Sequence, residues 1–164
     1  MTETENPTES PIVAATGRPH PARLSRALYP VIAPVTLRYG DVDVNRHINN
    51  LALEALHENA RAEFNDRVVP SAYRPGAQTI RLVVASHVVH FLAEVHWPGT
   101  LDTALGVGRI GRTSFVLSTA LFAGDTCASL CDSVLVTLGP EQGQGPTPIP
   151  DDVRDRLGTH LLRG

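Results

Sequence analysis

The densest group of reactive side chains lies in the segment 38–50, with the sequence RYGDVDVNRHINN. Asp43, Asn45 and His47 alternate there, so their side chains point to one side if the chain is extended. A carboxylate can act as a base or a nucleophile, an amide can hold a water or a substrate oxygen, and an imidazole can transfer a proton. The pattern indicates a catalytic site, although Asp41, Asp43 and the asparagines are also typical turn formers and helix caps.

The flanking elements would place this segment beside a helix N-terminus. Before it, apolar and polar residues alternate from Val35 to Tyr39, which is typical of a half-buried strand. After it, Asn49 and Asn50 are favourable N-caps for a helix that ends near residues 68–70. Free N–H groups in a first helical turn can polarise a carbonyl or stabilise an oxyanion. The apolar stripe of the predicted helix consists of Leu53, Leu56, Ala60 and Phe64.

The rest of the chain predicts a sheet. Residues 79–92, 101–109, 113–122 and 126–138 alternate with a period of two and are separated by turn signals, as in antiparallel strands. One strand, one long helix and four more strands predict a single α+β domain whose antiparallel sheet of about five strands wraps around the helix. The exposed edges of such a sheet favour a homodimer or a homotetramer.

The composition divides the chain into three predicted segments. Residues 1–33 are rich in proline and polar residues and predict a flexible arm, residues 34–139 form the folded domain, and residues 140–164 predict a linker and a short helix. Asp151 is the expected cap of that helix, and its apolar stripe consists of Val153, Leu157 and Leu161.

Net charge, hydropathy and cysteine content narrow the range of functions that the protein could have. The chain of 164 residues has 14 Lys plus Arg against 17 Asp plus Glu, a net charge of −3, and no basic stripe, which argues against nucleic acid as a partner. No apolar run approaches the roughly 20 residues that span a bilayer, and no signal segment is present, so we expect a cytoplasmic protein. Cys127 and Cys131 are expected to be reduced core thiols, and no metal-ligand pattern accompanies them.

The segment from Tyr39 to Asn50 resembles the Asp-x-Asp-x-Asn-x-His-x-Asn-Asn signature of hotdog-fold acyl-CoA and acyl-ACP thioesterases, which include the 4-hydroxybenzoyl-CoA thioesterase type. The resemblance continues through residues 56–61, LHENAR, which are similar to the Leu-Glu-x-Ala-Arg of the family helix, and covers roughly residues 34–138. It implies a hotdog fold that hydrolyses a thioester of CoA or of an acyl carrier protein without a metal or another cofactor.

The resemblance also implies roles for individual residues. The second Asp of the signature, here Asp43, is the nucleophile or base in the 4-hydroxybenzoyl-CoA type. In the acyl-ACP branch the matching Asp, Asn and His, here Asp43, Asn45 and His47, act with a carboxylate from the second strand. Residues 91–95 are similar to that branch's Tyr-x-x-Glu-x, which implies Glu94.

Further residues are expected to bind substrate. Asn49 and Asn50 are kept from the signature. Arg46 stands where many relatives have glycine, and it would either steer a phosphate of the substrate or mark a different turn. Arg109 and Arg112 suit CoA phosphates, because arginine contacts phosphate bidentately.

Two alternatives stay open at this stage. One is a hydratase or dehydratase acting on an acyl thioester, and another is a non-catalytic acyl-thioester sensor or acyl-CoA-binding protein. The segment His96-Trp97-Pro98-Gly99 is interpreted as a turn with a packed indole and not as a site.

Overall fold

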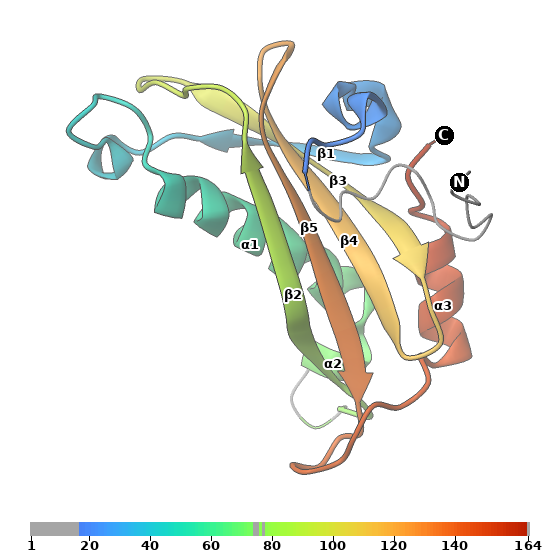
Figure 1. The fold of residues 1–164 in the computed structure, drawn as a ribbon. Helices are drawn as coiled ribbons and strands as arrows, with labels where there is room; N and C mark the ends of the chain where they lie inside the picture. The colour runs from blue at the N-terminus through green and yellow to red at the C-terminus, as the bar shows by residue number, and fades with distance from the viewer. Residues whose placement is uncertain (1–16, 74–75, 77, 164) are drawn as a thin grey trace, which may run out of the picture.

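The computed structural model describes residues 17–73, 76 and 78–163. In this part of the chain, one antiparallel sheet has the strand order β1-β3-β4-β5-β2, and a long helix, α1, lies along one of its faces (Figure 1). The strands are β1 (Val31–Thr36), β2 (Arg81–Phe91), β3 (Thr100–Ile110), β4 (Ser114–Ala123) and β5 (Thr126–Leu138). The predicted single α+β domain is therefore confirmed.

Helix α1 spans Asn50–Val68 and buries an apolar side against the sheet. Phe64 and Val68 join a core cluster with Leu105, Leu117 and Leu135 from the three inner strands. The C-terminal helix α3, Asp151–Gly158, adds Val153 and Leu157 to the same cluster, so both helices cover one face of the sheet. Its N-cap is Pro150 and not the expected Asp151, and Leu161 lies beyond the helix end, in a bridge with Val107.

The opposite face of the sheet is covered by the segment that precedes β1. Two short 3-10 helices, η1 (Pro21–Leu24) and η2 (Arg26–Leu28), pack there, and Leu28 and Tyr29 contact Phe122 and Leu130. Arg23 is fully buried, and its Nη1 donates to Asp132 Oδ2 at 2.8 Å. The boundary expected at residue 33 thus lies inside β1, and Arg23, Leu28 and Tyr29 of the segment before it are buried. Residues 1–16 of the expected arm lie outside the described residues.

Two local predictions also differ from the structure. The first strand was expected over Val35–Tyr39, but its pairing with β3 runs from Val31 opposite Leu105 to Thr36 opposite Thr100. Tyr39 instead opens a 3-10 helix, η3 (Tyr39–Asp41). The sequence also predicts a loop over residues 71–76, but residues 71–73 belong to the short helix α2 (Pro70–Tyr73).

Cys127 and Cys131 are buried free thiols, as predicted. Burial raises the pKa of each thiol to about 11, which keeps both protonated at neutral pH. No helix in the described ranges is both long and apolar enough to cross a membrane.

Candidate active site

The segment between η3 and α1 is a tight turn organised by Asp43. The Asp43 main chain donates to the carbonyl of His47 at 2.8 Å and accepts from the Arg46 N–H at 3.0 Å. The Asp43 side chain closes the turn, because its Oδ1 accepts from the N–H groups of Asn45 at 2.8 Å and His47 at 3.2 Å. The carboxylate is therefore held in place through one oxygen, while the other stays available for chemistry.

Arg46 sits in the left-handed region of this turn, with φ of 64°. Glycine reaches this conformation freely, whereas a residue with a Cβ pays about 1 kcal/mol for it. The turn geometry explains why glycine suits this position, and Arg46 lines a hollow of about 510 Å³ together with Tyr39 and Trp97.

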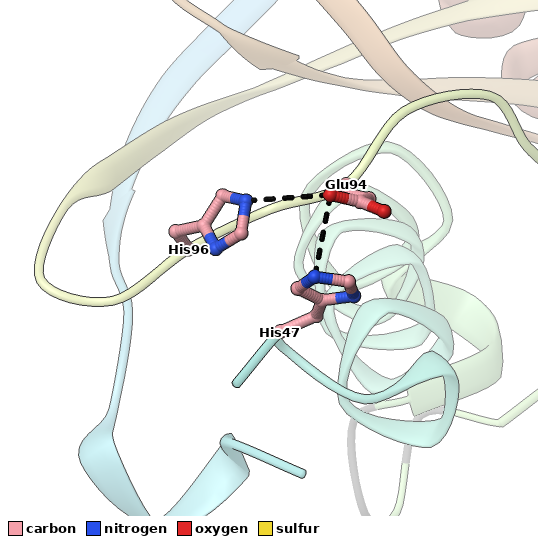
Figure 2. Close-up of side chains that lie close together, drawn as sticks. All are labelled: His47, Glu94 and His96. Carbon is pink, nitrogen blue, oxygen red and sulfur yellow. Dashed lines mark ion pairs between the residues drawn. The ribbon is translucent and has the colours of Figure 1, made fainter. Parts of the chain in front are cut away.

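A second segment, the connection between β2 and β3, meets the turn. The Ile48 N–H donates to the Val95 carbonyl at 2.7 Å, and both side chains are buried in one apolar cluster. This contact places Glu94 and His96, the neighbours of Val95, close to His47. Glu94 Oε2 lies 3.2 Å from His47 Nε2 and 3.6 Å from His96 Nε2 (Figure 2).

A cavity of about 660 Å³ opens where these segments meet the N-terminus of α1. Its polar lining comprises Asp43, Asn45, His47, Asn49, Asn50 and Glu94. Its apolar lining includes Leu51, Leu53, Phe91 and Val95. One cavity thus joins candidate acid–base groups to apolar surface that could receive an acyl chain.

The helix N-terminus supplies hydrogen-bond donors to this cavity. Asn49 caps α1, because its Oδ1 accepts from the Ala52 N–H at 2.8 Å. Within the described chain, the N–H groups of Asn50 and Leu51 have no hydrogen-bond partner. Such groups, together with the helix dipole, can stabilise negative charge on an oxygen.

The structure brings together most of the residues expected from the sequence. Asp43, Asn45, His47, Asn50 and Glu94 line the cavity. Asn49 lines it too, but its side chain is occupied, since it caps the helix and its Nδ2 donates to the Asp41 carbonyl at 2.7 Å.

Arg109 and Arg112 are not part of this cavity. They lie at the end of β3 and in the turn after it, whereas the start of β3, at Thr100, pairs with β1 near the site. Nine residues of extended chain separate Thr100 from Arg109, or about 30 Å. Arg109 instead lines a separate hollow of about 160 Å³ with Ser114 and Val134.

His96 is the residue that the sequence reasoning missed. It follows Glu94 by two positions across the buried Val95, so both side chains point away from the core on the same side. That spacing was visible in the sequence. The neighbouring proline and glycine favoured a turn with a packed indole, but Trp97 is 45% exposed.

A sheet wrapped on a long helix is the architecture of the hotdog fold. The chain belongs to the thioesterase-like superfamily, whose family model matches residues 37–157. This membership supports thioester hydrolysis in general.

Solved structures agree on the fold. A Pseudomonas aeruginosa PAO1 protein is 24% identical with a TM-score of 0.74, and the match covers 85% of this chain and 97% of that one. A predicted thioesterase from Bacillus stearothermophilus is 24% identical with a TM-score of 0.72, over 81% and 97% of the two chains. A thioesterase-superfamily protein from Jannaschia sp. CCS1 is 28% identical with a TM-score of 0.70, over 90% and 96%. No curated protein matches this chain.

Proposed function

We propose that this protein hydrolyses an acyl thioester of CoA or of an acyl carrier protein to the free acid and the thiol. The observation that carries the proposal is the cavity in which Asp43, His47 and Glu94 meet the N-terminus of α1. Family membership supports the reaction class, and the cavity supplies the groups that the reaction needs.

The thioester carbonyl would lie against the first turn of α1. Negative charge develops on its oxygen as the carbonyl carbon is attacked, and the N–H groups of Asn50 and Leu51 are free to stabilise that charge. The acyl chain would contact the apolar lining of the cavity, and the pantetheine arm would enter from solvent.

Asp43 is the proposed base or nucleophile. Its Oδ1 is fixed by two main-chain N–H groups, so the carboxylate is oriented without losing its second oxygen. Glu94, held by His47 at 3.2 Å, would position the attacking water, and Asn45 would orient the water or the carbonyl. Water attack forms the carbon–oxygen bond, the carbon–sulfur bond breaks, and the water proton passes through the carboxylate to the departing thiolate.

We further propose a homodimer that pairs through β2. This strand is a long edge of the sheet and leaves Val83, Val84 and Phe91 exposed. The opposite edge, β1, is short and contains Pro34, a residue that blunts strand addition. If the β2 strands of two copies paired, they would extend the sheet and close the side of the cavity that Phe91 lines.

The test is thiol release from a panel of acyl-CoAs that vary in chain length and include aromatic acyl groups. Asp43→Asn keeps an oxygen that can close the turn but removes the charge, and we expect kcat/KM to fall about 100-fold or more. Asp41→Asn is the matched control, because Asp41 lies in the same segment but pairs with the exposed Arg38 at 2.8 Å. We expect its activity to stay near that of the wild type.

Two outcomes would contradict the proposal. If the wild type binds acyl-CoA but releases no thiol from any substrate, the protein is a hydratase, a dehydratase or a binding protein. If thiol is released and Asp43→Asn matches Asp41→Asn, the assignment of Asp43 is wrong.

A further inference from the structure

We propose that His47, Glu94 and His96 form a binding site for a divalent transition-metal ion of the Zn²⁺ class. Each residue offers one ligand atom, and the three atoms lie within 4.8 Å of one another (Figure 2). His47 and Glu94 also line the cavity. Two imidazoles and one carboxylate are a donor set that Zn²⁺ accepts, with the remaining position open to water.

The main chain holds the three ligands together. His47 and Ile48 belong to the turn before α1, and Glu94, Val95 and His96 belong to the connection after β2. The hydrogen bond from Ile48 N–H to the Val95 carbonyl joins these segments at their buried residues. Side chains alternate in direction along each segment, so the residues flanking the buried Ile48 and Val95 point away from the core. The three ligands converge because the backbone is fixed.

The ligand separations suit a tetrahedral ion. Zn²⁺ binds nitrogen and oxygen at about 2.0–2.2 Å, which places neighbouring tetrahedral ligands about 3.4 Å apart. Glu94 Oε2 lies 3.2 Å from His47 Nε2 and 3.6 Å from His96 Nε2. All three ligand atoms lie within 4.8 Å of one another, a spread that one ion can bridge after the side chains rotate.

The hydrogen bond at the far side of His96 favours a cation in this position. His96 Nδ1 lies 3.3 Å from the Arg46 carbonyl, which can only accept, so Nδ1 carries the proton. The other ring nitrogen, Nε2, faces Glu94 Oε2 at 3.6 Å, and a ring nitrogen is a common metal ligand. The carbonyl contact at Nδ1 is the type of support that orients metal-bound histidines.

The exposure of the three ligands and the types of their donor atoms determine which ion can bind. The side chains of His47, Glu94 and His96 are 28%, 67% and 60% exposed, so an ion can enter without a change in fold. Imidazole nitrogen selects Zn²⁺ and its neighbours, whereas Mg²⁺ requires octahedral oxygen ligands. The inference goes beyond the proposed hydrolysis and does not depend on it. The ion would, however, bind the Glu94 carboxylate, which is proposed to position the attacking water.

The experiment is a titration of the untagged full-length chain with Zn²⁺ by calorimetry, and with Co²⁺ by visible absorption. We expect saturable Zn²⁺ binding and a Co²⁺ spectrum typical of nitrogen and oxygen ligands. His96→Gln removes a ligand that has no role in the proposed hydrolysis, and it should weaken Zn²⁺ binding about 10-fold or more. His20→Gln is the matched control, because His20 is also exposed but lies at the start of η1.

The result is decided by binding and not by activity, so it is separate from the outcome for hydrolysis. Equal Zn²⁺ affinity in His96→Gln and His20→Gln would overturn the proposal, as would the absence of saturable binding in the wild type. A thiolate-to-cobalt charge-transfer band would also overturn it, because the ion would then lie at Cys131, whose Sγ is 3.5 Å from His87 Nδ1. Circular dichroism of each variant checks that the fold is kept.

Discussion

At the scale of single residues, the inner side of α1 carries a buried histidine with a defined protonation state. His57 is 1% exposed, and its ring nitrogens lie 2.7 Å from Thr119 Oγ1 and 2.9 Å from Ser129 Oγ. Burial, together with the nearby His87 and Arg23, lowers the pKa of His57 to about 3. The ring is therefore neutral in the folded protein at all but acidic pH.

This burial predicts a loss of stability in acid. Between pH 6.5 and about 3 the unfolded chain binds a proton at His57 that the folded chain does not, so acid favours unfolding. From about pH 7.5 to about pH 5 the group should lower the free energy of unfolding by about 2 kcal/mol. Urea unfolding of the wild type and of His57→Gln at both values measures the difference, and the variant should lose less.

An identical pH dependence in the two proteins would contradict this assignment. Should His57→Gln not fold, an NMR titration of the wild-type His57 ring gives the same information. Protonation above about pH 5 would show that the ring is not buried in its neutral form.

At the scale of elements, the start of α1 is fixed by Asn49. The side chain accepts from the Ala52 N–H at 2.8 Å and donates to the Asp41 carbonyl at 2.7 Å, so it joins the helix to η3 as well as capping it. The free N–H groups that face the cavity depend on this position of the helix end.

We expect Asn49→Ala to lower the free energy of unfolding by about 1–2 kcal/mol, because it removes the cap. Asn49→Asp keeps the acceptor for Ala52 and adds a charge that favours a helix N-terminus, so it should lose clearly less. Urea unfolding at neutral pH measures both variants. Equal losses would mean that the bond to Ala52 contributes little and that the contact with Asp41 matters most.

At the scale of the whole molecule, the proposed dimer depends on the β2 edge. A wild-type dimer would have about twice the 17.6 kDa mass of the chain in light scattering. Val84→Lys places a charge on this edge and should shift the protein to monomer. Ile32→Lys is the matched control on the β1 edge, since Ile32 and Val84 are 44% and 42% exposed, and it should stay dimeric. A monomeric wild type, or the reverse response of the variants, would contradict pairing through β2.

Local patterns in the sequence determined much of the fold. The strand predicted over residues 126–138 has those bounds in the structure, and the helix predicted after Asn49 begins at Asn50. Both follow from short-range physics, because side-chain alternation and capping act within a few residues. Asp43 and His47 were expected together from their alternation, whereas Glu94 was expected only through the resemblance to a family.

Only the tertiary structure decided which distant residues meet. Arg23 is packed because its partner, Asp132, lies in β5, and a proline-rich composition carries no sign of that pairing. His96 joins His47 and Glu94 because one main-chain hydrogen bond holds Ile48 against Val95. Arg109 and Arg112 are far from the cavity because β3 is extended and carries the chain to the opposite end of the sheet. Contacts between distant segments depend on the whole packing of the chain, and periodicity within one segment does not encode them.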